Sequence, residues 1–557
     1  MPLKIGLFAC ELLYPDMPPH LGMCLFVNDL RQAGADVQPY LVHISETHRI
    51  PAIAEKEGFD LVAMESIFPL QAVRRIKQEL GRTPVLVGGV NALTLFLHSP
   101  VEYAVVGPGR RAFLALVDAL SGAGSLDSVP GLFHRVPGGK VDHSGIEGPW
   151  DVHGEVLPYH PEFRWTYVGP GHRGDVSLKL PAVVPEFGCH YARPSSQNEL
   201  FSDLPPHPIL GDPSLLPRAR EALERQISNG SRGCSFCVFR NQETSVLPVD
   251  QTVALVLEQV RHLREVWRTN DIYIQSENPF RFLEPLVEQL LSLGLRPDLL
   301  TVRTTPALLV RHRERLERCI ARLAADGGRL QIMQLGFESF VQRHLDLFNK
   351  GTTVEVNIEA CRILRALHRR FGPEVVEGFR GHGLILLHPW STLEDLRENL
   401  EIIDREAPFL RHAISVGSRL TLYNEFTPIF RKAMADRLVR RSTTGFGWDF
   451  RFRDPRMEAL PPLTGRLTDS VARLAGATGP GEEDRFKRIS LASQFELMAS
   501  AAEWIGMNGL DRIPADREEL PGDLLDTVQR VARRWIETSG GSHPGGPPPG
   551  NGEGSTT

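Results

Sequence analysis

The strongest constraint on the fold is a regular alternation of short apolar runs and amphipathic segments in the first 145 residues. Five apolar runs have the length of buried strands: residues 4–9, 37–42, 59–64, 84–87 and 103–106. Helical periodicity separates several of them, at residues 21–33, 71–80 and 111–120. This alternation predicts an α/β domain with a doubly wound parallel sheet of the Rossmann or flavodoxin-like kind.

Such sheets bind ligands beyond the carboxyl ends of their strands. Gly88 and Gly89 follow the fourth apolar run and Gly107 follows the fifth, where the absence of a side chain lets the backbone approach a ligand closely. Glycine turns after strands are common in α/β domains, so by themselves these residues only mark where a cofactor would bind.

Composition narrows the class of protein. The chain has 557 residues, of which 42% are hydrophobic and 23% charged, and this excludes a fibrous or wholly disordered protein. With 62 basic and 68 acidic residues, the net charge of −6 gives no reason to expect nucleic acid or an anionic membrane as partner. No apolar run approaches a membrane span, and the start of the chain reads as a strand rather than a secretion signal. Seven cysteines in so long a chain indicate a reducing cytoplasm rather than a disulfide scaffold.

The sequence pattern of the remaining chain divides it into five further segments. A β-hairpin is expected at residues 130–141, and a connector at 146–180. Residues 181–435 alternate strand and helix again, over a length that could close a barrel. The patterns after that predict a mostly helical region at 436–537 and a disordered Gly/Pro tail at 538–557.

The chemistry centres on Cys234 and Cys237, which form a C-x-x-C pair. Two thiolates at this spacing can bind one metal ion or cluster. Other interpretations are a zinc half-site, a redox pair or two unrelated thiols, although no second pair completes a four-cysteine zinc site. Cys319 and Cys361 lie in helical stretches and are expected to be buried hydrophobes. Cys189 differs, because it follows an apolar strand that ends at a glycine.

Several segments, taken in order, resemble a known family. In the first block they are residues 18–22, 60–62, 84–89 and 103–107. In the second block they are residues 271–278, 300–304, 335–339, 348–352, 383–396 and 419–428. Their order and spacing resemble the radical S-adenosylmethionine (SAM) enzymes with an N-terminal cobalamin-binding-type domain, over roughly residues 1 to 435.

The resemblance implies a partial (β/α)6 barrel whose strand ends hold SAM. It places Gly188-Cys189 at the end of the first barrel strand, Glu277 at the end of the second and Arg303 on the third. The stretch with the most specific match is Gly-Phe-Glu-Ser, with Glu338 and Ser339, followed by Asn-Lys-Gly-Thr. Phe236 stands between the two cysteines, where the family has an apolar side chain near the adenine.

Two departures from the family pattern matter. The usual cluster motif, C-x-x-x-C-x-x-C, would place its first cysteine at Gly230. Either Cys189 is the first ligand, with 44 residues inserted before Cys234 in a segment at 190–233, or the cluster is degenerate and the domain inactive. We favour Cys189, because its place on the strand is a better guide than local spacing and loop closure costs little more for a longer loop.

The second departure concerns cobalamin. Many family members carry D-x-H-x-x-G, whose histidine ligates cobalt, but Asp16 and His20 have a different spacing. The glycine at 107 also lacks the acidic residues that often follow it. Cobalamin is expected without a histidine ligand from the protein, either from His20 or from His43.

The chemistry implied by the resemblance is reductive cleavage of SAM. Three thiolates bind three irons of a [4Fe-4S] cluster and leave the fourth open to SAM. A low-potential donor such as flavodoxin or ferredoxin would supply the electron. The resulting enzyme would use cobalamin to methylate an unactivated carbon of a small-molecule or peptide substrate. The alternatives are a radical rearrangement or ring closure without methyl transfer, and a non-catalytic cobalamin- or SAM-binding protein.

Overall fold

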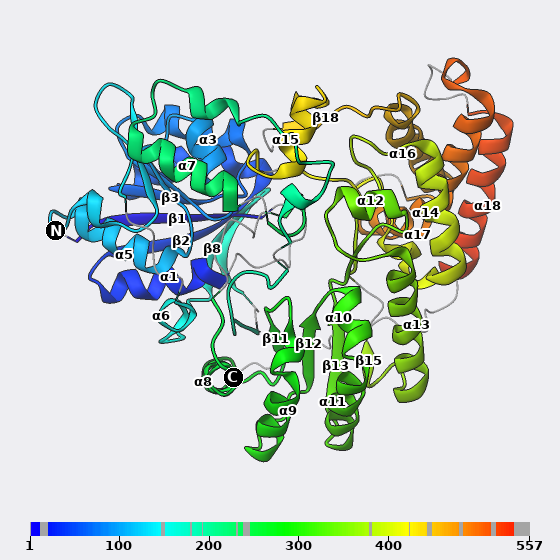
Figure 1. Ribbon diagram of the computed structural model, residues 1–557, viewed down its shortest axis with the longest axis horizontal. Coiled ribbons are helices and arrows are strands. Elements are labelled where there is room, and N and C mark those ends of the chain that lie inside the picture. Colours follow the sequence, from blue (N-terminus) through cyan, green and yellow to red (C-terminus); the bar gives the residue numbers. More distant parts are fainter. Residues whose placement is uncertain are drawn as a thin grey trace. The chain divides into compact units, whose positions relative to one another are not determined.

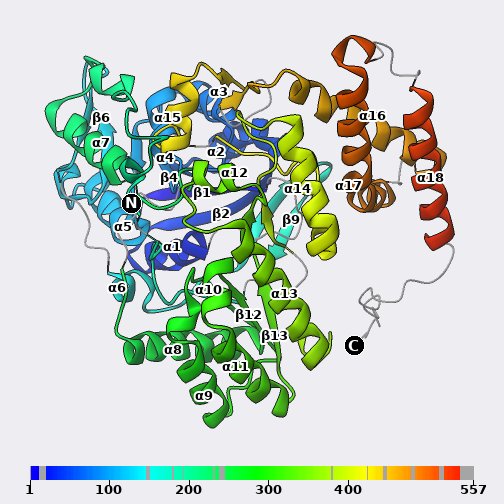
Figure 2. The ribbon, with the colours of Figure 1, turned by 45° about the vertical axis from the view of Figure 1, so that its right-hand side comes forward.

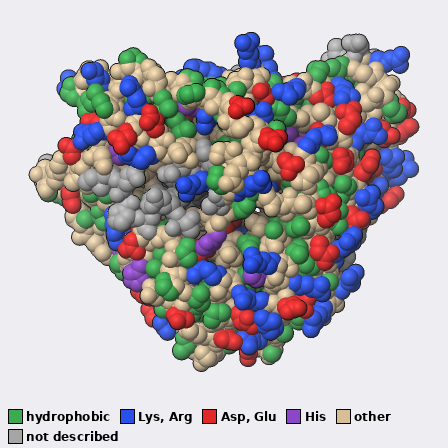
Figure 3. Space-filling view, viewed as in Figure 1, with side chains coloured by type: hydrophobic (Ala, Val, Ile, Leu, Met, Phe, Trp, Pro, Cys, Tyr) green, Lys and Arg blue, Asp and Glu red, His purple; other side chains and the backbone are tan. Residues whose placement is uncertain are grey.

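A computed structural model describes most of the chain, in two compact units. The described residues are 2–11, 21–145, 151–178, 181–191, 193–229, 232–237, 245–377, 381–422, 424–442, 448–477, 483–513 and 520–539. The first unit comprises Met1–Gly383 and Leu420–Arg451, and the second comprises Leu384–Arg419 and Phe452–Thr557. On the face shown in Figure 3, Lys and Arg side chains are interspersed with Asp and Glu side chains.

The first unit contains a large, mainly parallel sheet. Within the described residues it has nine strands in the order β7-β6-β5-β4-β3-β1-β2-β8-β9. The strands are β1 (Lys4–Glu11), β2 (Asp36–His43), β3 (Leu61–Glu65), β4 (Val85–Gly88), β5 (Tyr103–Val105), β6 (Leu132–Arg135), β7 (Val141–His143), β8 (Arg164–Gly169) and β9 (His172–Ser177). Neighbours from β5 to β8 are parallel, and the antiparallel strands β6, β7 and β9 form the edges.

Helices cover both faces of this sheet, as in a doubly wound fold. They are α1 (Leu21–Gln32), α2 (Ile50–Glu57), α3 (Leu70–Leu80), α4 (Ala92–His98) and α5 (Gly109–Leu120). α1 packs with α5 on one face, and α3 packs with α2 and α4 on the other (Figures 1 and 2). The amphipathic pattern explains this, because each helix buries one apolar stripe against the sheet. The predicted α/β class is confirmed.

Two segments outside the predicted first domain also build it. The expected connector, residues 146–180, contains α6 (Val152–Val156) as well as β8 and β9, and β8 pairs in parallel with β2. The insertion at 190–233 contains α7 (Pro217–Asn229), whose apolar residues share a core with the first sheet. A short apolar segment can pack against many apolar surfaces, and its own sequence does not identify which one. The sequence pattern therefore did not assign these segments to the first sheet.

The second block forms a smaller parallel sheet. Its described strands run β10-β11-β12-β13-β15: Ala182–Val183, Ile272–Ile274, Leu299–Arg303, Arg329–Met333 and Val376–Glu377. The helices between them are α8 (Val249–Trp267), α9 (Leu283–Ser292), α10 (Pro306–Arg311), α11 (Arg313–Ala325), α12 (Gln342–Leu347) and α13 (Val354–Phe371). Each neighbouring strand pair is parallel, as strand–helix alternation predicts.

Four expected barrel strands differ from the prediction. Residues 383–396 hold only the two-residue strand β16 (Gly383–Leu384), outside the five-stranded sheet, and the described residues of 419–428 form no strand. β10 ends at Val183, so Cys189 lies in the loop beyond the strand rather than at its last residue. The segment expected as the fourth strand, residues 335–339, is instead the short strand β14 (Gly336–Glu338) that follows β13. The left-handed backbone of Gln334, with φ of +53°, turns the chain between the two and explains the split.

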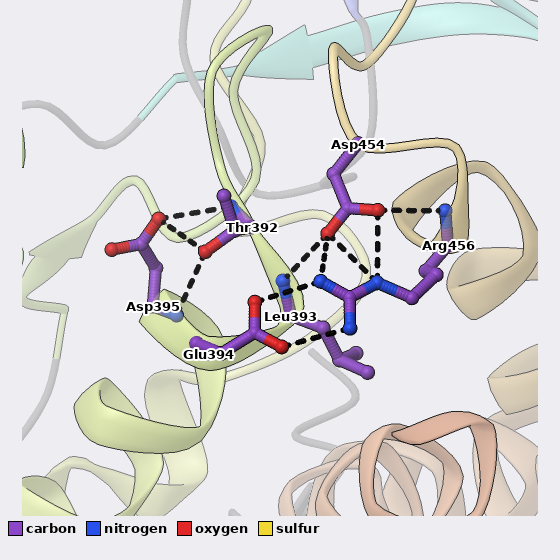
Figure 4. A network of polar contacts seen from close by, with 6 residues as sticks. All are labelled: Thr392, Leu393, Glu394, Asp395, Asp454 and Arg456. Atoms are coloured by element: carbon purple, nitrogen blue, oxygen red, sulfur yellow. Dashed lines mark hydrogen bonds and ion pairs between the residues drawn. The ribbon is translucent and has the colours of Figure 1, made fainter. Parts of the chain in front are cut away.

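The second unit is helical in its described parts: α14 (Leu393–Glu406), α16 (Arg456–Leu474), α17 (Glu483–Asn508) and α18 (Gly522–Ser539). A polar network joins the starts of α14 and α16 (Figure 4). Thr392 and Asp395 form a capping box, and Arg456 binds both Glu394 and Asp454. The earlier part of the region expected to be helical instead holds a hairpin of the first unit, β17 (Val439–Arg441) and β18 (Trp448–Phe450), after α15 (Pro428–Ala435). No helix in the described ranges combines the length and apolar character needed to cross a bilayer.

Candidate cluster and cofactor site

The two ends of the inserted segment are paired with each other, and we call this paired stretch, Arg193–Pro194 with Arg232–Gly233, the neck. The backbone N–H of Gly233 donates to the carbonyl of Arg193 at 2.7 Å, and Pro194 pairs with Arg232 as an antiparallel bridge. The neck lies four residues after Cys189 and one residue before Cys234. The 44 residues between these cysteines therefore do not separate them in space.

Lys350 interacts electrostatically with all three of these cysteines, Cys189, Cys234 and Cys237. Its Nζ lies 2.8 Å from Oε1 of Glu338, and both side chains are 9% exposed. Burial opposes the charge on Lys350, but Glu338 and the thiols of Cys234 and Cys237 outweigh it and raise its pKa. Burial also raises the pKa of the Cys189 thiol, and Lys350 acts in the opposite direction. Cys189 and Cys234 also interact electrostatically with each other.

By the chemistry of its donors, this set of three thiols fits an iron–sulfur cluster. Among the residues that the structure describes, no three His, Cys, Asp or Glu side chains are grouped closely enough to hold one metal ion. A four-iron cluster requires a different arrangement, because each thiolate binds a different iron. All three cysteines are partly exposed, unlike the buried Cys319 and Cys361, and a buried cation stands beside them. Soft thiolates next to a positive charge suit an iron–sulfur cluster.

The predicted aromatic and carboxylate residues lie around this group. Phe236 packs edge-on against Phe348, with ring centroids 5.4 Å apart, and Lys350 lies 6.0 Å from the Phe236 ring. Glu277 follows β11 and forms an ion pair of 2.5 Å with Arg303, the last residue of β12. Glu277 also contributes to the raised pKa of Cys189, so this ion pair interacts with that thiol.

Ser339 has a different environment from its neighbour Glu338. Its hydroxyl is fully buried, lies 3.1 Å from Nδ1 of His344 and accepts the backbone N–H of Val341. These contacts belong to the turn that leads into α12. In the structure the Ser339 hydroxyl supports this turn, and its assignment to SAM remains a prediction.

The sequence analysis did not single out Glu186 as a site residue. Glu186 is buried, contacts the hydroxyl of Ser276 and lies 3.2 Å from Nε2 of His190 and 3.4 Å from Arg281. Burial would raise the pKa of its carboxyl, but His190 and Ser276 hold that pKa below its ordinary value. The signal in the sequence was an acidic residue inside an apolar segment, three positions before Cys189.

The carboxyl edge of the first sheet carries the predicted glycines and two carboxylates that the sequence analysis missed. Gly88 ends β4, and Gly89 has φ of +103°, where a Cβ would lie 2.7 Å from Oγ of Ser66. Glu11 ends β1 and Glu65 ends β3, and both are buried. The strand order reverses between β1 and β3, which is where doubly wound sheets bind ligands.

Of the histidines considered as cobalt ligands, His43 lies at this carboxyl edge, where it stands opposite Glu11 in the parallel β1–β2 pair. His43 ends β2, and its Nδ1 accepts the backbone N–H of Ser45 to cap the turn that follows. His20 and Asp16 lie outside the described residues. Gly107 follows β5 and also has a positive φ, of +112°.

Comparison with known proteins adds information on the fold. No protein-family model and no curated protein sequence matches the chain. Solved structures do match. The cobalamin-dependent SAM radical enzyme OxsB, with aqua-cobalamin and SAM bound, aligns with a TM-score of 0.55 at 15% identity, over 96% of this chain and 80% of its own.

A second protein of the same kind also matches. The radical SAM methyltransferase TsrM from Kitasatospora setae, with cobalamin and a [4Fe-4S] cluster bound, aligns with a TM-score of 0.50 at 15% identity, over 90% of this chain and 100% of its own. At this level of identity the likeness concerns the fold alone. Over nearly its whole length, the chain shares the fold of these cobalamin-dependent radical SAM proteins.

Proposed function

We propose that the chain is a radical SAM enzyme that methylates an unactivated carbon of a small-molecule or peptide substrate with the help of cobalamin. The observation that carries the proposal is the grouping of Cys189, Cys234 and Cys237 around the buried Lys350–Glu338 pair. The fold shared with OxsB, solved with aqua-cobalamin and SAM, and with TsrM, solved with cobalamin and a [4Fe-4S] cluster, supports it.

The chain's own residues would have distinct tasks. The three thiolates would hold three irons, and Lys350 would offset part of their negative charge. Glu338 and the Glu277–Arg303 pair present charged groups beside the cysteines, suited to the amino and carboxylate groups of SAM. Phe236 offers an apolar face for the adenine.

The first sheet would hold cobalamin at its carboxyl edge, beside Gly88, Gly89 and Gly107. Glu11 and Glu65 would accept hydrogen bonds there from the amide groups of the corrin. When bound, the cluster would supply the electron that cleaves SAM and cobalamin would carry the methyl group. The electron would come from a low-potential donor such as flavodoxin or ferredoxin.

Cysteine variants test the ligand assignment. Anaerobically reconstituted wild-type protein should contain about four irons and about four sulfides per chain. Cys189→Ala should lose the cluster as fully as Cys234→Ala does, whereas Cys361→Ala, at a buried cysteine on α13, should keep it. Iron and sulfide analysis with ultraviolet–visible spectra measures this. A complete cluster and SAM cleavage in Cys189→Ala would contradict the assignment.

The same protein distinguishes the alternative functions. Transfer of label from methyl-labelled SAM to a product carbon supports methylation. Cleavage of SAM without any uptake of cobalamin favours a radical rearrangement or ring closure. If the wild-type protein binds neither iron nor sulfide, the remaining interpretation is a non-catalytic cobalamin- or SAM-binding protein.

A further inference from the structure

The neck of the insertion is held by a side chain as well as by backbone bonds. Asn349 is 1% exposed, and its Nδ2 donates to the carbonyls of Gly233, at 2.6 Å, and Arg193, at 3.2 Å. One amide thus binds both sides of the neck. Asn349 reaches them from a left-handed backbone conformation with φ of +48°, which asparagine tolerates better than most residues.

The residues beside Asn349 contact the same two sides. The backbone N–H of Ser235 donates to the carbonyl of Phe348 at 2.8 Å, and its buried hydroxyl donates to the carbonyl of Leu347 at 2.7 Å. On the other side, Tyr191 packs on Gly351, where a Cβ would lie 2.3 Å from its phenolic oxygen. Lys350 lies between these contacts in the sequence and interacts electrostatically with the three cysteines.

We propose that the Phe348–Gly351 turn is a clasp that joins the two halves of a split cysteine motif, with Asn349 as its main positioning residue. One half carries Cys189 and Tyr191, and the other carries Gly233 to Cys237. The role of the clasp in cluster binding rests on the cluster assignment proposed above. The contacts that form the clasp lie within the protein chain and do not depend on that assignment.

The chemistry of the amide explains why asparagine is suited to this position. Two carbonyl oxygens face Asn349, and its NH₂ group supplies two donors. Aspartate has nearly the same shape but only acceptors when ionised, so it would place a negative charge against two carbonyls. In a buried position such an unsatisfied charge strongly disfavours the closed neck.

Cross-linking in the protein without cluster tests the clasp directly. A short bismaleimide should join Cys189 to Cys234 or Cys237 in the wild-type chain, with peptide mapping by mass spectrometry to identify the pairs. Asn349→Asp should slow this cross-link at least several-fold. Asn424→Asp is the matched control, because Asn424 is also buried and donates to a carbonyl, that of Val90, away from the neck.

Each outcome decides for or against the clasp. A wild-type rate in Asn349→Asp, or no cross-link in the wild type, overturns it. If Asn349→Asp does not fold by circular dichroism, Ser235→Ala, which removes a single arm, should still slow the cross-link about twofold. An unchanged rate in that variant would also refute the proposal.

Iron analysis separates the clasp from the proposed function. If both are correct, reconstituted Asn349→Asp should hold several-fold less iron than the wild type. If the wild type holds no iron but its cross-link is still lost in Asn349→Asp, the cluster assignment fails and the clasp stands.

Discussion

At the scale of single residues, the pair of His160 and Asp29 links the stability of the first sheet to pH. His160 Nε2 lies 3.2 Å from Asp29, which also binds Arg110. The close contact with Asp29 is the main cause that raises the pKa of His160 above its ordinary value of 6.5. A raised pKa means that the pair stabilises the fold fully below pH 6.5 and that this contribution is lost as the pH rises through the pKa of the folded state.

We therefore expect His160→Gln to lower the melting temperature most near pH 5 to 6 and much less near pH 9. Asp29 stays ionised in that window, because His160 and Arg110 outweigh its burial and lower its pKa. Melting curves over this pH range measure the effect. His153→Gln, at an exposed histidine, is the control, and a gap between His160→Gln and wild type that grows with pH would contradict the expectation.

At the scale of elements, α7 attaches the insertion to the first sheet. Leu223 is fully buried in the core that α7 shares with the sheet, and Arg218 binds Asp142 on β7 at 2.6 Å. Leu223→Ala should reduce the free energy of unfolding by about 2–5 kcal/mol, because it leaves a cavity in that core. Urea unfolding measures this loss.

Arg225→Ala, on the same helix, provides the matched control. Arg225 forms an exposed pair with Glu221, and such surface pairs contribute about 0–1 kcal/mol. The two variants should therefore differ clearly in their denaturation midpoints. Equal midpoints would mean that α7 is not part of the core of the first sheet.

At the scale of the whole molecule, the second unit is built from two separate stretches of chain. α14 belongs to the first stretch and packs on α17 from the second. A chain truncated after Arg451 would expose the buried face of α14, formed by Leu393, Leu396, Leu400 and Ile403. Each such side chain contributes about 1.5–3 kcal/mol when buried, so we expect poor solubility and binding of the dye ANS.

Truncation after Ser539 tests the expectation that the tail adds no stability. The tail was predicted to begin at 538, but residues 538 and 539 belong to α18, which ends at Ser539. The truncation removes only the Gly/Pro-rich residues 540–557, whose composition offers no core. The melting temperature and soluble yield should stay at wild-type values. A clear drop in either would contradict the interpretation of the tail.

The sequence by itself determined the elements whose signal is local. The apolar runs at β1 to β5 and the helices α1, α3 and α5 follow from periodicity, and the doubly wound sheet follows from their alternation, although α2 and α4 were not predicted. The C-x-x-C at Cys234 and the glycines after β4 and β5 were also readable, because each combines a residue type with a position in the chain. Even so, the strands β8 and β9 were expected to be a connector.

Only the tertiary structure decided which distant residues meet. Nothing in the spacing of Cys189 and Cys234 states that Arg193 and Gly233 close the neck between them, because a backbone hydrogen bond leaves no signature in side-chain pattern. The same holds for Asn349, which binds that neck from a turn more than a hundred residues away, and for the packing of α7 on the first sheet. These contacts form because complementary surfaces that the fold brings together pack closely, which is favourable. Whether two distant segments are complementary cannot be determined from the sequence of either segment alone.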